Sequence, residues 1–500
     1  MELSTVLSRA QRGIEAPLVR VETHISNGLP AFNIVGLPAT AVRESKERVR
    51  SAIMNSHFDW PDRRLTVNLA PADLPKDGGR FDLPIALGIL AASEQLPLPA
   101  LQDREFIGEL ALNGELRPVS GSVAAAIGSS RQQHILVVPA ANAAIAAIVP
   151  GTKIVAAGQL LELCAWLQGA ADVEFAKPDP DSSIEACPDL AQVRGQALGK
   201  RALEIAAAGG HNLLFTGPPG TGKTMLASRL PGILPELEPQ ERLEIMALRS
   251  ATEPTTSSAG CWQRPFRAPH HSASAQALVG GGVLPRPGEI SLAHQGVLFL
   301  DELPEFPRRV LEMLREPLES GEVTISRALQ QLTFPARFQF VAAMNPCPCG
   351  FDGDSQRDCR CTSDQIQRYR ARLSGPLLDR IDLLVSLSRV PAGLLLNQQQ
   401  EAEPSASVRQ RVQQARRLAL ARSGVINAGL NASQLEQVCR LQTQDRRMLE
   451  QAMDTLGLTF RACQRVLRVA RSIADLTGAI DLERPHLIEA LGYRQFDSQE

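Results

Sequence analysis

The stretch GPPGTGKT at residues 217–224 constrains the fold of this 500-residue chain more than any other. It matches the pattern G-x-x-x-x-G-K-[ST], a loop whose backbone N–H groups surround the phosphates of a nucleoside triphosphate. The apolar segment HNLLF precedes it and a helical pattern follows, which is the strand–loop–helix context that this pattern requires. The sequence therefore predicts an α/β core that binds ATP at the edge of a parallel sheet.

Every residue of this loop is expected to contact ATP or its metal ion. Glycines let the backbone close around the phosphates, and the positive end of the following helix favours negative charge there. Lys223 should reach the β- and γ-phosphates, and the Thr224 hydroxyl should bind Mg²⁺. The predicted set is Gly217, Pro218, Pro219, Gly220, Thr221, Gly222, Lys223 and Thr224.

Two further apolar segments end in polar residues. GVLFLDE leads to Asp301 and Glu302, and FQFVAAMN leads to Asn345. Ligands of open parallel sheets bind beyond the carboxyl ends of the strands, so these side chains should converge on the loop. We expect Asp301 to hold Mg²⁺, Glu302 to polarise the attacking water, and Asn345 to orient that water or sense the γ-phosphate. A single acidic pair after a strand is usually a solvated cap, but three such strands in this order favour an ATPase.

Chain length and local composition predict three regions. Residues 1–168 alternate short apolar runs with helical patterns, which indicates an α+β domain, and residues 169–189 form a polar, acidic linker. Residues 190–393 carry the ATP motifs. Residues 394–500 read as a helical tail.

Composition narrows the setting in which the protein works. The net charge of −2 gives no global basicity, so any nucleic-acid surface must be local. No signal peptide opens the chain, and the apolar run near residues 135–150 is broken by Pro139 and Asn142, so we expect a cytoplasmic protein with no membrane contact.

Four cysteines cluster in the loop at residues 347–361: Cys347, Cys349, Cys359 and Cys361. Four thiolates suit a tetrahedral structural Zn²⁺ site. The C-x-C spacing is tighter than the usual C-x₂-C. Free or redox-active thiols are therefore the alternative.

Two segments could contact DNA. In GEVTISRALQQLTFPARF, apolar residues alternate on both sides of a short turn, which predicts a hairpin with Arg327 towards its tip. Residues 357–380 combine arginines with Tyr369, which fits either a DNA-tracking surface or a solvated helix face. His270 and His271 would point to opposite faces of a regular strand, so we expect no metal there.

The order of these motifs resembles that of AAA+ ATPases. SGPLLDRIDL at residues 374–383 is similar to the arginine-finger segment of their helix-insert clade, and LTFRACQRVLRVARSIADL resembles the second-sensor helix of their lid. The resemblance implies that Arg380 reaches the γ-phosphate of a neighbouring subunit, that Arg461 is the sensor arginine, and that the working form is a hexameric ring. Surface salt bridges are the alternative for both arginines.

RPFRAPHHSASAQALVGGG, RPGEISLAHQGVLFLDELPEF and AAMNPCPCG together resemble the YifB/ComM family of magnesium-chelatase-like AAA+ ATPases. The resemblance covers nearly the whole chain. It implies a hexameric DNA helicase that promotes branch migration during homologous recombination of incoming DNA (natural transformation), with recombination proteins as further partners. The alternatives are a chelatase-type ATPase subunit that drives metal insertion through a partner, or a DNA-binding adaptor that does not translocate.

The first region resembles the proteolytic domain of Lon protease in LPKDGGRFDLPIALGIL and FIGELALNGELRPVSG. Lon places its nucleophilic serine shortly after PKDG, where this chain has Gly79, Arg80, Phe81 and Asp82, and Ser93 lies a full helix away. A serine–lysine mechanism needs the two groups within hydrogen-bond reach. We expect no peptidase activity, and a role as scaffold or DNA-contacting collar of the ring.

Overall fold

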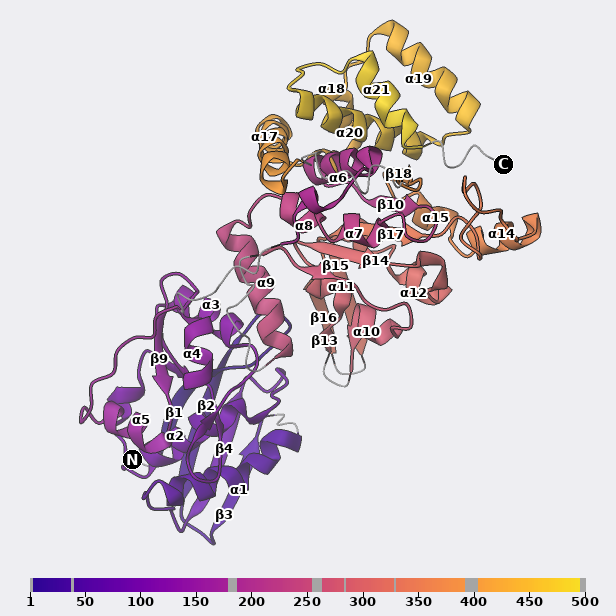
Figure 1. Ribbon diagram of the computed structural model, residues 1–500. Coiled ribbons are helices and arrows are strands. Elements are labelled where there is room, and N and C mark those ends of the chain that lie inside the picture. The colour runs from indigo at the N-terminus through magenta and orange to yellow at the C-terminus, as the bar shows by residue number, and fades with distance from the viewer. Residues whose placement is uncertain are drawn as a thin grey trace.

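The computed structural model has three parts that follow one another along the chain (Figure 1). The amino-terminal part lies at one end, a core with a parallel sheet lies in the middle, and a group of helices covers the far side of that core. The structure describes residues 3–36, 40–178, 187–253, 263–282, 285–327, 330–391 and 403–494.

The amino-terminal part is built on a seven-stranded mixed sheet in the order β3-β4-β2-β1-β5-β8-β9. Its helix α2 (Asp82–Ala92) is buried along its whole length, as expected for a helix that is apolar all round. The strands are β1 (Leu3–Arg9), β2 (Leu18–Ser26), β3 (Ala31–Val35), β4 (Arg64–Ala70), β5 (Arg104–Phe106), β8 (Ile135–Pro139) and β9 (Lys153–Ala157). The other helices are α1 (Thr40–Asn55), α3 (Ser122–Gln132), α4 (Ala140–Ala146) and α5 (Leu160–Leu167).

The core sheet has five parallel strands in the order β11-β14-β17-β10-β18. Its inner strands are continuous apolar runs, as expected for parallel strands with both faces covered. The strands are β10 (Leu213–Thr216), β11 (Phe266–Arg267), β14 (Val297–Leu300), β17 (Gln339–Met344) and β18 (Leu383–Ser386). This parallel α/β core, with a mixed α/β part before it and helices after it, confirms the predicted fold class.

The flanking helices of the core include α6 (Ala197–Gly209), α7 (Lys223–Ala227) and α9 (Pro239–Thr252). The predicted hairpin is present: β15 (Glu322–Arg327) pairs with β16 (Gln330–Pro335) in antiparallel register. Its alternating apolar side chains are all buried, namely Val323, Ile325, Leu332 and Phe334. The side chain of Arg327 lies outside the described residues.

The helical group comprises α17 (Ser405–Ser423), α18 (Ala432–Val438), α19 (Thr443–Leu456), α20 (Phe460–Thr477) and α21 (Arg484–Gly492). Helix α20 carries the apolar face that packs on the core, and one buried cluster continues from α6 and the sheet into α20 and α21. The helical group therefore shares the hydrophobic core of the ATP-motif region, and we refer to this group as the lid.

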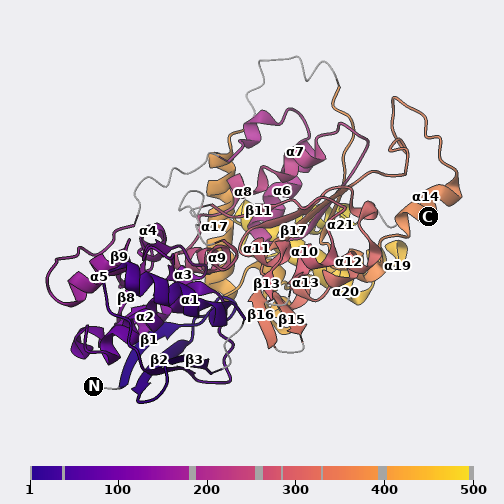
Figure 2. The ribbon, with the colours of Figure 1, turned by 90° about the horizontal axis from the view of Figure 1, so that it is seen from below.

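Helix α9 joins the core to the amino-terminal part. It packs beside α3 in both views (Figures 1 and 2), and Met246 and Ala247 share a buried apolar cluster with α3 residues. The Gly121 N–H donates to the Ser250 carbonyl at 2.6 Å across this contact. Among the described residues, no helix is long and apolar enough to cross a membrane.

Candidate nucleotide-binding site

The loop at residues 217–222 connects β10 to α7, and its conformation explains its glycines. Gly220 and Gly222 have φ values of +81° and +87°, in the left-handed region that favours glycine. A Cβ atom at Gly217 would collide with the Leu387 carbonyl oxygen. The backbone of the loop can take this path only because side chains are missing at these positions.

Lys223 begins α7 and turns back into the loop. Its Nζ donates to the carbonyls of Gly217 (2.6 Å) and Pro218 (3.0 Å) and to Asn345 Oδ1 (3.1 Å). Burial lowers the pKa of Lys223, while the nearby carboxylates of Asp301 and Glu302 act in the opposite direction. The structure thus brings Asn345, which follows β17, to the lysine of the loop.

Thr224 and Asp301 also lie together. The Thr224 hydroxyl donates to Asp301 Oδ2 at 2.6 Å, and the other carboxylate oxygen accepts from the Glu302 backbone N–H at 2.9 Å. Hydroxyl and carboxylate oxygens are ligands that Mg²⁺ accepts. These two residues could hold a magnesium ion beyond the carboxyl ends of β10 and β14.

Glu302 has an unusual backbone, with φ +53° and ψ +47°. A residue other than glycine is uncommon in this left-handed region, and such strain gathers at functional sites. Its Oε2 lies 3.2 Å from His271 Nδ1. The position of this carboxylate is therefore shaped by its own backbone and by a histidine from another strand's loop.

His271 is a residue that the motif analysis did not place in the site. The expectation that His270 and His271 point apart is wrong, because β11 ends at Arg267 and the histidines lie in the turn beyond it. Their rings lie 4.1 Å apart between centroids. The sequence did contain a signal for this contact. The turn with His271 follows β11, which pairs with β14, and Glu302 follows β14.

Arg380 lies at the opposite end of the sheet. It precedes β18, which runs parallel to β10 with Leu383 opposite Leu213, whereas the phosphate loop follows the last residue of β10. Four strand residues at about 3.3 Å each separate these two ends by about 13 Å. The Arg380 guanidinium pairs with Glu319 and donates to the Arg315 carbonyl at 3.2 Å.

Arg380 and Arg461 line the same cavity, of about 660 Å³, between the base of the hairpin, the start of β18 and the lid helix α20. Among the described residues, the lining includes no part of the loop at 217–224. Its other arginines are Arg337, Arg465 and Arg468. The structure therefore places the two predicted arginines on the same cavity, which does not include the phosphate loop of their own chain.

Asp382 joins this cavity to the lid. Its carboxylate accepts from the Asn212 backbone N–H at 3.0 Å and from Arg465 at 2.6 Å, and lies 3.7 Å from His211. Burial alone would raise the pKa of Asp382, but His211, Arg465 and the backbone N–H hold it well below its usual range. Asp382 is therefore a buried carboxylate that connects the sheet to α20.

The four cysteines of the loop at 347–361 come together, with all their sulfur atoms within 4.8 Å of one another. Three of the separations are 3.4–3.6 Å, close to the ~3.8 Å between sulfurs bound at 2.3 Å to a tetrahedral zinc. Hydrogen bonds from the Arg360 and Phe351 backbone lower the pKa of Cys349 to about 6, whereas burial and the neighbouring thiols raise the pKa of Cys359 and of Cys361. The donor set fits a structural zinc ion.

The cysteine loop touches the phosphate loop. A Cβ atom at Gly350 would lie 2.8 Å from Pro219 Cδ and 3.8 Å from Asn345 Cγ. The segment that follows the cluster is mostly exposed, but its Tyr369 is buried, and burial raises the pKa of Tyr369 to about 12. Tyr369 is therefore not exposed among these arginines, and a DNA-tracking surface over residues 357–380 stays a prediction that rests on the arginines alone.

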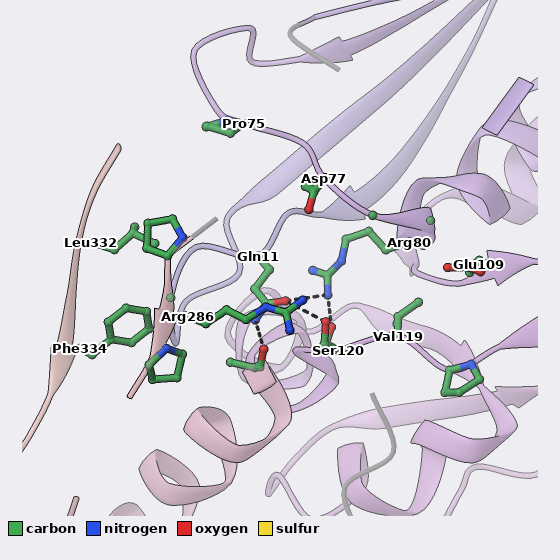
Figure 3. Close-up of a pocket in the computed structure, with 17 residues that line it drawn as sticks. Gln11, Pro75, Asp77, Arg80, Glu109, Val119, Ser120, Arg286, Leu332 and Phe334 are labelled. Atoms are coloured by element: carbon green, nitrogen blue, oxygen red, sulfur yellow. Dashed lines mark hydrogen bonds between the residues drawn. The ribbon is translucent and has the colours of Figure 1, made fainter. Parts of the chain in front are cut away.

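A second cavity, of about 230 Å³, lies between the amino-terminal part and the core (Figure 3). Arg80 reaches into it and donates to the Ser120 carbonyl and to Gln11 Oε1. Burial lowers the pKa of Arg80 to about 10, so it stays charged and cannot serve as a base at neutral pH. Lys76 is fully buried and donates to the carbonyls of Gly36 and Pro71.

Ser93, the serine nearest after PKDG, caps the far end of α2 and bonds to that helix's own carbonyls. Arg80 and Asp82 at the near end are separated from Ser93 by the length of the helix, about 16 Å.

The parallel sheet, the phosphate loop and the polar residues at the ends of β14 and β17 define the class of the protein: it is a P-loop ATPase of the AAA+ type. Family models described as "Magnesium chelatase, subunit ChlI" and its C-terminal part match residues 189–395 and 402–494, and "Subunit ChlI of Mg-chelatase" matches residues 21–142.

Competence protein ComM of Haemophilus influenzae is 51% identical over 99% of this chain and 98% of the relative, and YifB of Escherichia coli is 50% identical over the same shares. The magnesium-chelatase 38 kDa subunit of Cereibacter sphaeroides is 27% identical over 34% of this chain and 53% of that subunit. The chain belongs to the YifB/ComM family of magnesium-chelatase-like AAA+ ATPases.

Proposed function

We propose that this protein is a ring-forming motor that uses ATP to move branched or single-stranded DNA. In this proposal it promotes branch migration in homologous recombination of incoming DNA, works in the cytoplasm and meets other recombination proteins there. The observation that carries the ring is the placement of the phosphate loop and the arginine cavity at opposite ends of one sheet. Full-length similarity to a competence protein supports the DNA-related role.

In the proposed ring, a complete site forms between two subunits. One subunit supplies the loop from Gly217 to Thr224, with Lys223 on the phosphates and Thr224 and Asp301 on Mg²⁺. Glu302 accepts a proton from the attacking water, and Asn345, already bonded to Lys223, orients that water. The neighbour supplies Arg380 and Arg461, which neutralise charge that develops on the γ-phosphate. A head-to-tail contact of this kind closes into a ring, here a hexamer.

The cysteine cluster enters the proposal as a structural zinc site. Because Gly350 lies against Pro219, a zinc ion on Cys347, Cys349, Cys359 and Cys361 would brace the phosphate loop from outside. The DNA contact is assigned to the exposed polar face of the hairpin β15–β16, whose apolar face is buried in the core.

An ATPase assay with and without forked DNA tests the motor, and a porphyrin serves as the control ligand. We expect forked DNA to stimulate hydrolysis and the porphyrin to have no effect. Stimulation by the porphyrin alone would favour a chelatase-type subunit, which the partial similarity to a magnesium-chelatase subunit makes the second candidate. DNA binding without stimulation would favour an adaptor.

Mixing two inactive variants tests the shared site. Arg380→Ala should fail to hydrolyse ATP, because arginines of this kind contribute about 10³–10⁵ in turnover. Lys223→Ala should also fail, because it lacks the lysine that contacts the phosphates. In a mixed ring, the intact Lys223 of one variant can meet the intact Arg380 of the other, so activity should partly return. If mixed rings form but show no ATPase activity, Arg380 does not act on the site of a neighbouring subunit.

A further inference from the structure

Arg337 lines the cavity of about 660 Å³, and its side chain has no acidic partner among the described residues. It follows β16 and lines the cavity together with Arg380 and Arg461. Within the described ranges, its exposed guanidinium makes no hydrogen bond or ion pair. A cation that is left without a counter-charge at the mouth of a cavity is suited to an incoming anion.

The backbone of Arg337 is, by contrast, firmly held. Its N–H donates to His294 Nδ1 at 3.0 Å, and its carbonyl accepts from the Gln295 N–H at 2.6 Å. The neighbouring Ala336 N–H donates to the Gly321 carbonyl at 2.7 Å, which closes the base of the hairpin β15–β16. The backbone contacts fix the Arg337 Cα where the hairpin joins the sheet, and the side chain remains free to reach a ligand.

The charge of the cavity is not balanced by its own carboxylates. Glu319 forms an ion pair with Arg380, and Asp382 forms ion pairs with Arg465 and His211. Asp379 is exposed, whereas the buried Arg468 Nε lacks a hydrogen-bond partner. Arg337, Arg461 and Arg468 therefore leave an excess of positive charge, as a polyphosphate would require.

We propose that Arg337 binds the β- or γ-phosphate of the ATP held by the phosphate loop of an adjacent copy. This inference rests on the shared site proposed above and adds a residue to it. Because Arg337 directly follows Ala336, whose N–H closes the hairpin base, the arginine also connects the nucleotide of one subunit to the hairpin of the next. The hairpin of each subunit would then respond to its neighbour's ATP.

The test uses full-length Arg337→Ala and Arg337→Lys, with Arg447→Ala as the control, since Arg447 is an exposed lid arginine on α19 that does not line the cavity. We expect Arg337→Ala to bind a fluorescent ATP analogue normally but to turn over about 10²-fold more slowly, as when one transition-state donor is removed. Arg337→Lys should fall in between, and Arg447→Ala should match the parent. Parental turnover in Arg337→Ala would overturn the inference.

Mixing then identifies the subunit on which Arg337 acts. Combined with Lys223→Ala, Arg337→Ala should regain activity, because about a quarter of the interfaces in a random ring pair an intact loop with an intact Arg337. This recovery also shows that the variant folds. If the mixture of Arg380→Ala with Lys223→Ala regains ATPase activity and the mixture of Arg337→Ala with Lys223→Ala does not, Arg337 acts within its own chain. The inference about Arg337 then fails, while the shared site stands. If neither recovers, the shared site itself fails.

Discussion

The two ends of the core sheet are organised differently. At the carboxyl end, the predicted catalytic residues already contact one another: Lys223 bonds to Asn345 and Thr224 bonds to Asp301. At the amino end, Arg461 and Arg337 border a cavity of about 660 Å³ without an acidic partner among the described residues. One end is thus assembled within the chain, while the other presents positive charge outward. This difference indicates which half of a shared site each end would supply.

The largest effects are expected at the assembled end. Lys223→Ala should lose ATP binding, because no other side chain of the loop carries its charge. Glu302→Gln should keep ATP and hold the ring together, with hydrolysis reduced by about 10²–10⁴-fold through loss of the general base. Glu305→Gln is the matched control, since Glu305 is exposed and pairs with Arg372 at 2.9 Å. A parental rate in Glu302→Gln would assign the base elsewhere.

A second change removes the contacts of Asp382 that connect the amino end of the sheet to the lid. Asp382→Asn leaves Arg465 and His211 without their buried partner, which should lower the free energy of unfolding by about 3–5 kcal/mol. Asp379→Asn, three residues earlier and exposed, should have little effect. Urea unfolding of both variants at pH 7 measures the difference, and equal stabilities would show that these contacts contribute nothing.

The same pair of variants predicts a pH dependence. The pKa of Asp382 is lower in the folded chain than its unfolded value near 4. Its stabilising contribution is therefore complete above about pH 4 and is lost as the pH falls towards the lower, folded pKa. Acid unfolding should be steeper in the parent than in Asp382→Asn, and parallel curves would contradict this assignment.

A smaller effect should follow from the cysteine loop. Purified protein should carry about one zinc ion per chain if the four thiolates close one site. Cys349→Ser combined with Cys361→Ser should release the metal, lower the melting temperature and weaken ATP binding, because this loop contacts Pro219. Cys187→Ser, outside the cluster, is the control. Metal analysis without zinc, in protein purified without chelators, would leave the cluster as free thiols.

The smallest effect is expected at His271. Its contact with Glu302 joins two partly exposed side chains, and pairs of this kind contribute about 0.2–1 kcal/mol. A carboxylate held by His271 is less available to accept a proton from water, so His271→Ala should raise hydrolysis without DNA by up to about fivefold. Ser272→Ala in the same turn serves as the control. An unchanged or lower rate would show that the histidine does not restrain Glu302.

Local patterns were sufficient for the phosphate loop, the polar ends of β14 and β17, the hairpin and the cysteine cluster. In each case the chemistry lies within a short segment: glycines permit the left-handed turn at Gly220 and Gly222, alternation marks the hairpin, and four thiols share fifteen residues. Family resemblance added Arg380 and Arg461, which no spacing in the chain connects to the loop.

Contacts between distant segments were decided only by the order of strands in the sheet and by lid packing. These place Arg337, Arg380 and Arg461 on one cavity, bring His271 to Glu302, set Gly350 against Pro219 and bury Tyr369. The physical reason is that a parallel sheet sorts residues by the end of the strand on which they lie and not by their distance along the chain. The hydrophobic core shared with α20 then determines which side chains meet at each end.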